Sequence, residues 1–412
     1  MTTPRREFLK TLGALALIEP ALRERESVPA QELARDEDFW FAVRRAYDIT
    51  PSFIHLESGW FSPVAREVRD AQFQYMTRLN ELTSFYLRRM YDDEKVMIKR
   101  KMGELAGLSP EEFVICRNTT EALDTVILGL ELEPGDELVW CEREYPSMKD
   151  ALEQRAERDG TVNKVIRVPM VPETDSEVVE LYEKAIGPKT KAILVSHMIY
   201  LTGQILPVRK ICDMAHARGV EVIVDAAHSF AHIDFKIPDL NCDYLGTSLH
   251  KWLGAPLGTG LMYMRQDKIA KVWPLFADRI YPKDDIRKFE HLGTRPVAVE
   301  QTLLESIQFH DSIGAKRKEE RLRYLKNYWV ERVAALPRVV INTPMKDHQS
   351  CAIANVAIEG MEPKAVADYF FDEHRIFTVA VDMGVRVSPN LFTEISDLDA
   401  LARAIEQLSR RG

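Results

Sequence analysis

Short apolar runs and longer stretches with helical periodicity alternate along the middle of the chain. The apolar runs are rich in β-branched residues and are bounded by turn sequences, which is typical of buried strands. They occur at 111–116, 137–140, 164–168, 191–196 and 220–225. Helical stretches such as 207–218, which is followed by Gly219, lie between them. Alternating strands and helices predict an α/β fold, with a mostly parallel, mixed sheet sandwiched by helices in a large domain at 76–300.

The pattern changes after about residue 296, where a long helical stretch runs to about residue 336. Shorter elements follow, with strands expected at 352–358 and 376–381 and helices at 363–374 and from 397. This change of pattern predicts a smaller α+β domain at 301–412. We expect the N-terminal segment 31–75 to pack on that small domain.

The first thirty residues have a composition of their own. The pair Arg5-Arg6 precedes Phe8-Leu9-Lys10 and a short apolar stretch at 12–18, and Val28-Pro29-Ala30 offers small residues for cleavage. This arrangement resembles a twin-arginine export signal, which predicts a signal peptide at 1–30 and a periplasmic protein. The alternative is an ordinary N-terminal helix on a cytoplasmic protein. The stretch is too short to cross a bilayer, and we expect it to pack poorly on the surface and to remain outside the core.

Composition narrows the classes of function. The 412 residues are 46% hydrophobic and 29% charged, as in an ordinary soluble globular protein. With 55 basic and 64 acidic residues the net charge is −9, which argues against nucleic acid as a partner. No apolar run is long enough to predict a membrane span. The 5 cysteines form no C-x-x-C pair, so neither a disulfide framework nor a zinc site is expected.

Two stretches place polar side chains where an α/β sheet binds ligands. Asp225 ends the apolar run 220–225, and ligands of open sheets lie at the carboxyl ends of the strands. A carboxylate there can keep a pyridine nitrogen protonated, although a single Asp can equally cap a helix. Thr119 and Thr120 begin a predicted helix, where backbone N–H groups and the helix dipole favour a phosphate.

A third stretch supplies an amine. Ser248, His250 and Lys251 precede a turn that is rich in glycine, at 254–260. A lysine held beside a phosphate site can form a Schiff base with an aldehyde, and the serine and histidine can donate hydrogen bonds to phosphate. Taken by itself, this stretch could be a solvated loop.

The three stretches together, in this order, resemble the class V aminotransferase family of pyridoxal-phosphate (PLP) enzymes of fold type I, from about Phe53 to the C-terminus. The resemblance implies PLP as cofactor, with Lys251 as the aldimine lysine and Asp225 on the pyridine nitrogen. His228 is implied near the ring hydroxyl, and Tyr145 stacked on the ring. The residues implied to bind the phosphate are Thr119, Thr120, Ser248 and His250.

Three further positions are interpreted through the same resemblance. Thr294 corresponds to a segment that reaches the phosphate of the neighbouring subunit, which implies a homodimer with shared active sites. Arg386 corresponds to the arginine that holds the substrate α-carboxylate, and Tyr200 stands where cysteine desulfurases place an asparagine. His228 and His232 have the spacing of a helical zinc pair but lack a third ligand, so no metal is expected.

The reaction is harder to predict, because transamination, epimerisation and elimination share these motifs. The segment 377–385 contains no cysteine, which argues against a persulfide-forming desulfurase. The sequence Val-Asp-Ala-Ala-His at 224–228 resembles the isopenicillin-N-epimerase-like branch, and the leader resembles that of periplasmic enzymes that tailor siderophore peptides.

Our leading hypothesis is a PLP-dependent aminotransferase-like enzyme. It would act at the α-carbon of an amino acid or of an amino-bearing small molecule or peptide, through Lys251. The alternatives are a carbon–sulfur lyase or an epimerase on the same scaffold, and a binding protein that has lost catalysis.

Overall fold

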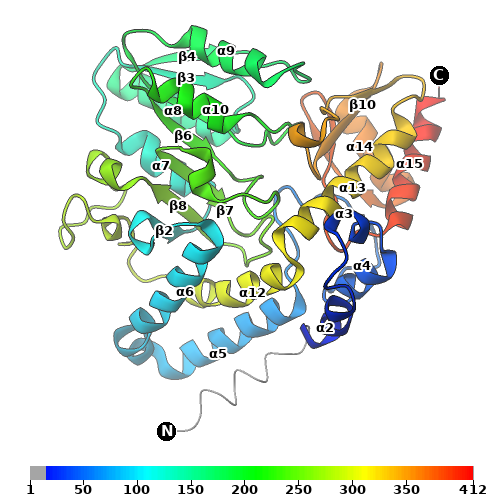
Figure 1. The fold of residues 1–412 in the computed structure, drawn as a ribbon, viewed down its shortest axis with the longest axis horizontal. Helices are drawn as coiled ribbons and strands as arrows, with labels where there is room; N and C mark the ends of the chain where they lie inside the picture. Colours follow the sequence, from blue (N-terminus) through cyan, green and yellow to red (C-terminus); the bar gives the residue numbers. More distant parts are fainter. Residues whose placement is uncertain (1–14, 412) are drawn as a thin grey trace.

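The computed structural model describes residues 15–411, which form a large and a small domain (Figure 1). The large domain is built on a seven-stranded sheet with strand order β2-β8-β7-β6-β5-β3-β4. Strand β8 is antiparallel to both of its neighbours, and the other pairs are parallel. The strands are β2 (Phe113–Cys116), β3 (Glu137–Cys141), β4 (Val162–Ile166), β5 (Thr190–Ser196), β6 (Glu221–Asp225), β7 (Tyr244–Ser248) and β8 (Gly260–Met264). The predicted mixed, mostly parallel sheet is confirmed.

Helices cover both faces of this sheet, which explains why its central strands carry apolar side chains on both faces. In β5, Ile193 and Val195 pack on one face, whereas Ala192 and Leu194 pack on the other. The first face is covered by α6 (Tyr91–Ala106), α9 (Asp175–Ala185), α10 (Val208–His216) and α12 (Leu303–Ile313). The second face is covered by α7 (Thr119–Gly129) and α8 (Pro146–Asp159).

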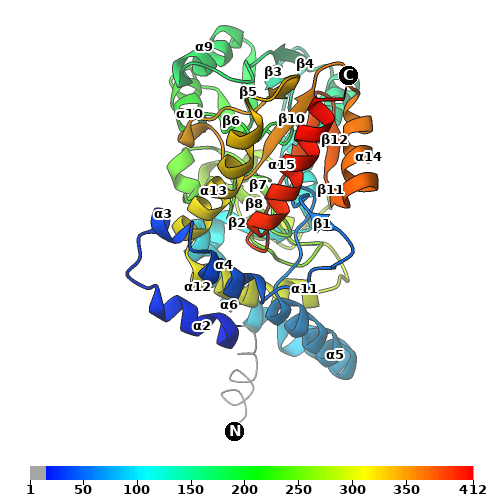
Figure 2. The ribbon, with the colours of Figure 1, turned by 90° about the vertical axis from the view of Figure 1, so that its right-hand side faces the viewer.

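The small domain contains a four-stranded antiparallel sheet of order β12-β13-β10-β9. Its strands are β9 (Val339–Ile341), β10 (Ala354–Ile358), β12 (Val379–Val381) and β13 (Gly384–Val387), and they pack with α13 (Ala315–Val333), α14 (Pro363–His374) and α15 (Ile395–Ser409). Figure 2 shows α15 on the outside of this layer. The strand expected at 376–381 is divided at Thr378, because β11 (Ile376–Phe377) pairs instead with β1 (Ile54–His55).

The long helical stretch after residue 296 consists of three helices. The short α11 (Ala298–Gln301) and α12 are separated at Thr302, and α12 and α13 are separated at Gly314. Gly314 has φ +92°, a backbone conformation that favours glycine and ends the helix. Helix α12 lies against the large domain through Leu303 and Ile307, and α13 leads into the small domain (Figure 1).

The N-terminal segment forms α2 (Leu15–Glu24), α3 (Ala30–Leu33), α4 (Glu37–Arg44) and the long α5 (Arg66–Arg89). Phe39, Trp40 and Val43 of α4 lie in one apolar cluster with Leu322 of α13 and Leu391. The cluster also includes Trp252, which follows Lys251 in the sequence. The N-terminal helices are therefore packed close to the loop that carries the predicted catalytic lysine.

The leader corrects one expectation. Arg5 and Arg6 lie outside the described residues, but Ile18 of α2 is fully buried in the same cluster as Phe39. Arg317 of α13 donates hydrogen bonds to the carbonyls of Arg25 (3.1 Å) and Glu26 (2.6 Å). The expectation that this stretch stays out of the core is wrong for Ile18, because α2 packs against α4 and α12.

Within residues 15–411, none of the helices has both the length and the apolar character that a membrane span requires.

Candidate active site

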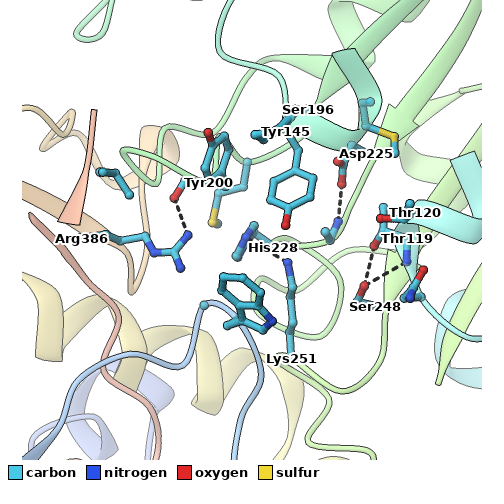
Figure 3. A pocket seen from close by; sticks show the side chains of 18 of the residues that line it. Thr119, Thr120, Tyr145, Ser196, Tyr200, Asp225, His228, Ser248, Lys251 and Arg386 are labelled. Carbon is cyan, nitrogen blue, oxygen red and sulfur yellow. Dashed lines mark hydrogen bonds between the residues drawn. The ribbon is translucent and has the colours of Figure 1, made fainter. Parts of the chain in front are cut away.

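A cavity of about 430 Å³ opens at the carboxyl ends of β5 and β6, beside the N-terminus of α7 (Figure 3). Its lining includes ten residues that the sequence predicted for the site: Thr119, Thr120, Tyr145, Tyr200, Asp225, His228, Ser248, His250, Lys251 and Arg386. These residues come from both domains, since Arg386 belongs to β13 of the small sheet. Thr294 is exposed and lies outside this lining.

Lys251 points into the cavity from the loop after β7. Its Nζ lies 3.2 Å from Nε2 of His228 and 5.9 Å from the centroid of the Tyr145 ring. Desolvation lowers the pKa of Lys251 to about 8, while the charge of Asp225 opposes that shift. A substantial fraction of the amine is therefore neutral near pH 8, and only the neutral amine is nucleophilic.

His228 is held in a defined protonation state. Burial lowers its pKa well below the usual range, so the ring is neutral. The indole Nε1–H of Trp252 donates to Nδ1 of His228 at 3.4 Å, which leaves the ring proton on Nε2. The Nε2–H then faces the lone pair of Lys251. His232 supports this arrangement, because it donates from Nδ1 to the His228 carbonyl (2.7 Å) and stacks on Trp252.

Asp225 ends β6 and is 6% exposed. Its Oδ1 accepts a hydrogen bond from the backbone N–H of Ala227 at 2.9 Å. Burial raises the pKa of Asp225, whereas this hydrogen bond and the charge of Lys251 lower it. A protonated pyridine nitrogen placed at this carboxylate would gain the buried ion pair that the carboxylate otherwise lacks.

Glu144, which the sequence reasoning missed, is a second buried acid near Asp225. Its carboxyl group accepts a hydrogen bond from the backbone N–H of Ser196 (3.2 Å) and bonds to the Ser196 hydroxyl. Burial, reinforced by the charge of Asp225, raises the pKa of Glu144 to about 8. Glu144 is therefore mostly protonated at neutral pH. Its position directly before Tyr145 was the available signal.

The N-terminus of α7 and the end of β7 meet in the cavity, at the place where a phosphate was expected. The Ser248 hydroxyl lies 3.0 Å from the backbone N of Thr119 and 2.7 Å from its Oγ1. Gly260 lets β8 approach this turn, because a Cβ at residue 260 would lie 2.7 Å from the backbone of Asn118. His250 Nδ1 donates to the Thr259 carbonyl at 3.2 Å, so Nε2 can donate to phosphate only from the protonated ring.

The aromatic wall of the cavity is made by Tyr145 and Tyr200. Their rings meet edge to face, with centroids 5.2 Å apart and an interplanar angle of 83°. Tyr145 lies on the side of the cavity toward which the Lys251 amine points (Figure 3). The Tyr145 ring lines the cavity, and its stacking on a planar cofactor stays a prediction.

Arg386 reaches the cavity with its guanidinium already paired. Nη2 and Nε donate to the two carboxylate oxygens of Glu57 at 2.6 and 3.3 Å, and Nη1 donates to the Tyr200 carbonyl at 3.1 Å. Glu57 is the second acid that the sequence reasoning missed, because it precedes its partner by 329 residues. Within residues 15–411, no group of three or more His, Cys, Asp or Glu side chains is placed to hold a metal ion.

A lysine of lowered pKa, an acid at the end of the adjacent strand and a hydroxyl cradle at a helix N-terminus fit the aldehyde, ring nitrogen and phosphate of PLP. The fold and the site together define a PLP-dependent enzyme of fold type I. The family model for class V aminotransferases matches residues 65–404. The chain belongs to this family, which uses PLP.

The curated relatives include isopenicillin N epimerases. The chain is 25% identical to that of Streptomyces clavuligerus and 27% identical to that of Amycolatopsis lactamdurans. These matches cover 90% of this chain and 98% and 99% of the relatives. A probable cysteine desulfurase of Halalkalibacterium halodurans is 28% identical, over 73% of this chain and 78% of that protein.

Solved structures share the fold at lower sequence identity. A variant of C-DES with glycine covalently linked to its PLP cofactor has a TM-score of 0.80 at 19% identity, and covers 90% of this chain and 99% of its own. The cysteine desulfurase of Thermococcus onnurineus has a TM-score of 0.79 at 21% identity, with 89% and 97% covered. The predicted fold is confirmed by these likenesses.

Proposed function

We propose that this chain is an aminotransferase-like PLP enzyme that acts at the carbon bearing the amino group of its substrate. The observation that carries the proposal is the placement of the Lys251 amine, with its lowered pKa, in one cavity with the Asp225 carboxylate. When bound there, PLP supplies an electron sink for the substrate carbon.

Each residue has a role that follows from its surroundings. Lys251 attaches the cofactor and, once released by the substrate amine, serves as general base for the proton on the reacting carbon. Asp225 keeps the proton on the pyridine nitrogen, and His228 donates from Nε2 to an acceptor beside the lysine. Thr119 and Ser248 hold the phosphate.

The protein can be tested directly for the role of Lys251. Borohydride reduction of the purified protein followed by peptide mapping should place the reduced cofactor on Lys251. Label on another lysine, or a cofactor that stays reducible in Lys251→Ala, would contradict the proposal.

Epimerisation is the second candidate reaction, because the two isopenicillin N epimerases match over almost their whole length. Product analysis with single-enantiomer amines separates the outcomes. Transamination gives a carbonyl product and converts the cofactor to its amine form. Epimerisation gives the opposite enantiomer and leaves the cofactor unchanged, and a carbon–sulfur lyase releases ammonia and a sulfur product from cysteine conjugates.

We further propose a homodimer with shared active sites. Its support is a set of exposed apolar side chains on α5, α6 and the loop before Thr294: Phe73, Met76, Phe85, Val96, Met97, Trp273, Phe276 and Ile280. Exposed apolar surface of this kind marks protein interfaces. Thr294 is exposed on the same region of the chain and is free to reach the phosphate site of a partner.

Export to the periplasm is proposed from the Arg5-Arg6 motif. Replacing both arginines by lysine should retain the protein in the cytoplasm in folded form, with its cofactor bound. Cell fractionation with a cofactor-absorbance measurement on each fraction tests this. Unchanged periplasmic protein in the double variant would refute the twin-arginine route.

A further inference from the structure

The ion pair between Glu57 and Arg386 decides what charge the cavity presents to a substrate. Both side chains are almost completely buried, at 5% and 6% exposure. The carboxylate takes the Nε and Nη2 side of the guanidinium, and the Tyr200 carbonyl takes Nη1. The side-on pair of donors, Nε and Nη2, is therefore filled by the protein itself, and Nη1 is engaged by the Tyr200 carbonyl.

Glu57 is fixed in this position by the backbone around it. The backbone on either side of it pairs with Ser388, the residue after β13, through Ser58 N to Ser388 O (3.0 Å) and Ser388 N to Leu56 O (2.8 Å). Its carboxylate also accepts from the Ser388 hydroxyl (3.1 Å) and from the backbone N–H of Trp60 (3.0 Å). Four donors in total converge on one carboxylate, so it is not a side chain that swings freely.

Gly59 adds a steric reason for this arrangement. A Cβ at residue 59 would lie 2.8 Å from Cζ and Nη2 of Arg386. Only a glycine lets the backbone pass this closely to the guanidinium. The turn 57–60 thus packs its backbone against one side of the Arg386 guanidinium, and the Glu57 carboxylate is bonded to another side.

The remaining cations of the cavity cannot replace Arg386. Lys251 carries the cofactor, and the rings of His228 and His250 are neutral because burial lowers their pKa values, that of His250 to about 4. The described lining otherwise consists of neutral side chains and Asp225. A substrate carboxylate entering here finds no unpaired positive charge, and displacing Glu57 would leave that carboxylate buried without its partner.

We propose that Glu57 is a specificity-determining residue that directs the site to amines whose reacting carbon carries no carboxylate anion. Amino amides, amino esters and simple primary amines are the chemical class. Met198, Val379 and Val381 line the cavity and suit the neutral substituent of such a substrate. This inference rests on the proposed function, since it concerns the substrate of the same lysine.

The experiment uses the purified protein with its cofactor and pairs of amines that differ only in the carboxyl group, such as alanine with alaninamide and phenylalanine with phenylalaninamide. The readout is the concentration of each amine that half-saturates the change in cofactor absorbance. The variant is Glu57→Gln, which keeps the shape of the side chain and removes its charge. Asp382→Asn is the matched control, because Asp382 is an exposed acid near Tyr200 that does not contact Arg386.

The natural protein should respond to the amides at lower concentration than to the acids. Glu57→Gln should lower the half-saturating concentration of the acids about tenfold and leave that of the amides nearly unchanged. Asp382→Asn should not produce this change. If Glu57→Gln loses its cofactor, Ser388→Ala is tested in its place. This variant removes one hydrogen bond from Glu57 and should shift the preference between acids and amides in the same direction.

Two results are distinguishable failures. If the natural protein prefers the acids, or the variants leave the ratio of acid to amide unchanged, the inference about Glu57 is overturned while the proposed function stands. If no amine of either kind changes the cofactor absorbance, although the cofactor is attached to Lys251, the proposed function itself fails and the inference fails with it.

Discussion

At the scale of single residues, the site depends on ionisable groups whose proton affinities are changed by burial. Burial lowers the pKa of Lys251 and raises the pKa of Glu144 and of Asp225, whereas the Ala227 N–H and the Lys251 charge oppose the shift of Asp225. The result is an amine with a lowered pKa in the same cavity as a buried carboxyl group. That combination suits attachment of an aldehyde and protonation of a pyridine ring.

The pKa of Lys251 predicts how the protein without cofactor captures PLP as pH changes. The capture rate follows the neutral amine, so it should rise with pH and level off above about 8, rather than near the ordinary value of 10.5. Stopped-flow absorbance after removal of the cofactor measures this, with Lys251→Ala as the inactive control. Asp225→Asn should move the midpoint lower, because the aspartate charge raises the lysine pKa. A midpoint near 10.5 would show that the amine is not desolvated.

The same pKa affects folding stability in a definite direction. Between about 8 and 10.5 the unfolded chain keeps the lysine proton that the folded protein has released. The unfolded state then binds more protons, so the contribution of Lys251 stabilises the folded protein as pH rises through this window.

Asp225→Asn should also separate cofactor binding from catalysis. The amide preserves the shape of the side chain but cannot stabilise a protonated ring nitrogen. We expect the cofactor to remain bound while turnover falls by about a hundredfold or more. Absorbance of the purified variant and steady-state rates with the best amine found would check this, and near-normal turnover would count against the assigned role.

At the scale of elements, α2 combines features of the two expectations for residues 1–30, which were a signal peptide outside the core and an ordinary N-terminal helix. It is a surface helix, yet Ile18 is buried and Arg317 holds the turn that follows the helix. The residues that line the active-site cavity all lie beyond residue 58. Removing the leader should therefore affect stability and leave the chemistry in place.

Deletion of residues 1–30 should lower the free energy of unfolding by about 2 kcal/mol, the value of burying one large aliphatic side chain. Denaturant unfolding of the full-length and truncated proteins measures the difference, and Ile18→Ala in the full-length chain provides the matched comparison. Cofactor attachment and turnover should be unchanged. A truncated protein that fails to hold PLP would mean that α2 is a structural helix of the mature protein.

At the scale of the whole molecule, shared active sites predict that two inactive variants can restore each other. Lys251→Ala removes the lysine of one subunit, and Thr294→Ala removes the residue expected to reach the partner's phosphate. In a mixed dimer, one of the two sites receives both natural residues. Coexpression should therefore give more activity than the sum of the separate variants.

If the two chains carry different affinity tags, the mixed dimer can be isolated from the two parent dimers and its activity measured separately. Lys251→Ala combined with Asp225→Asn is the matched control, because both changes fall in the same site of each chain and cannot be repaired from the partner. Restoration in the control pair, or none in the test pair, would show that Thr294 does not act across subunits.

The sequence alone was sufficient for the features that are local. The strands around Val195 and Val224 were predictable because both faces of a parallel sheet are buried, which requires continuous apolar runs. Asp225 was predictable because it ends such a run, and the carboxyl ends of parallel strands meet at one edge. Lys251 was predicted from its place after Ser248 and His250 and before a glycine-rich turn, and its role from the family resemblance. The position of Thr119 at a helix start was also predictable, and its binding of a phosphate stays a prediction.

Only the tertiary structure decided the partners of these residues. The pairing of Glu57 with Arg386, the burial of Glu144 beside Asp225 and the contact of Trp252 with His228 join residues that are far apart in the sequence. The burial of Ile18 depends in the same way on helices that follow it at a distance. Periodicity and spacing report which face of an element is buried, but the charge of a site depends on which side chains from different elements meet there, and chain folding alone determines that.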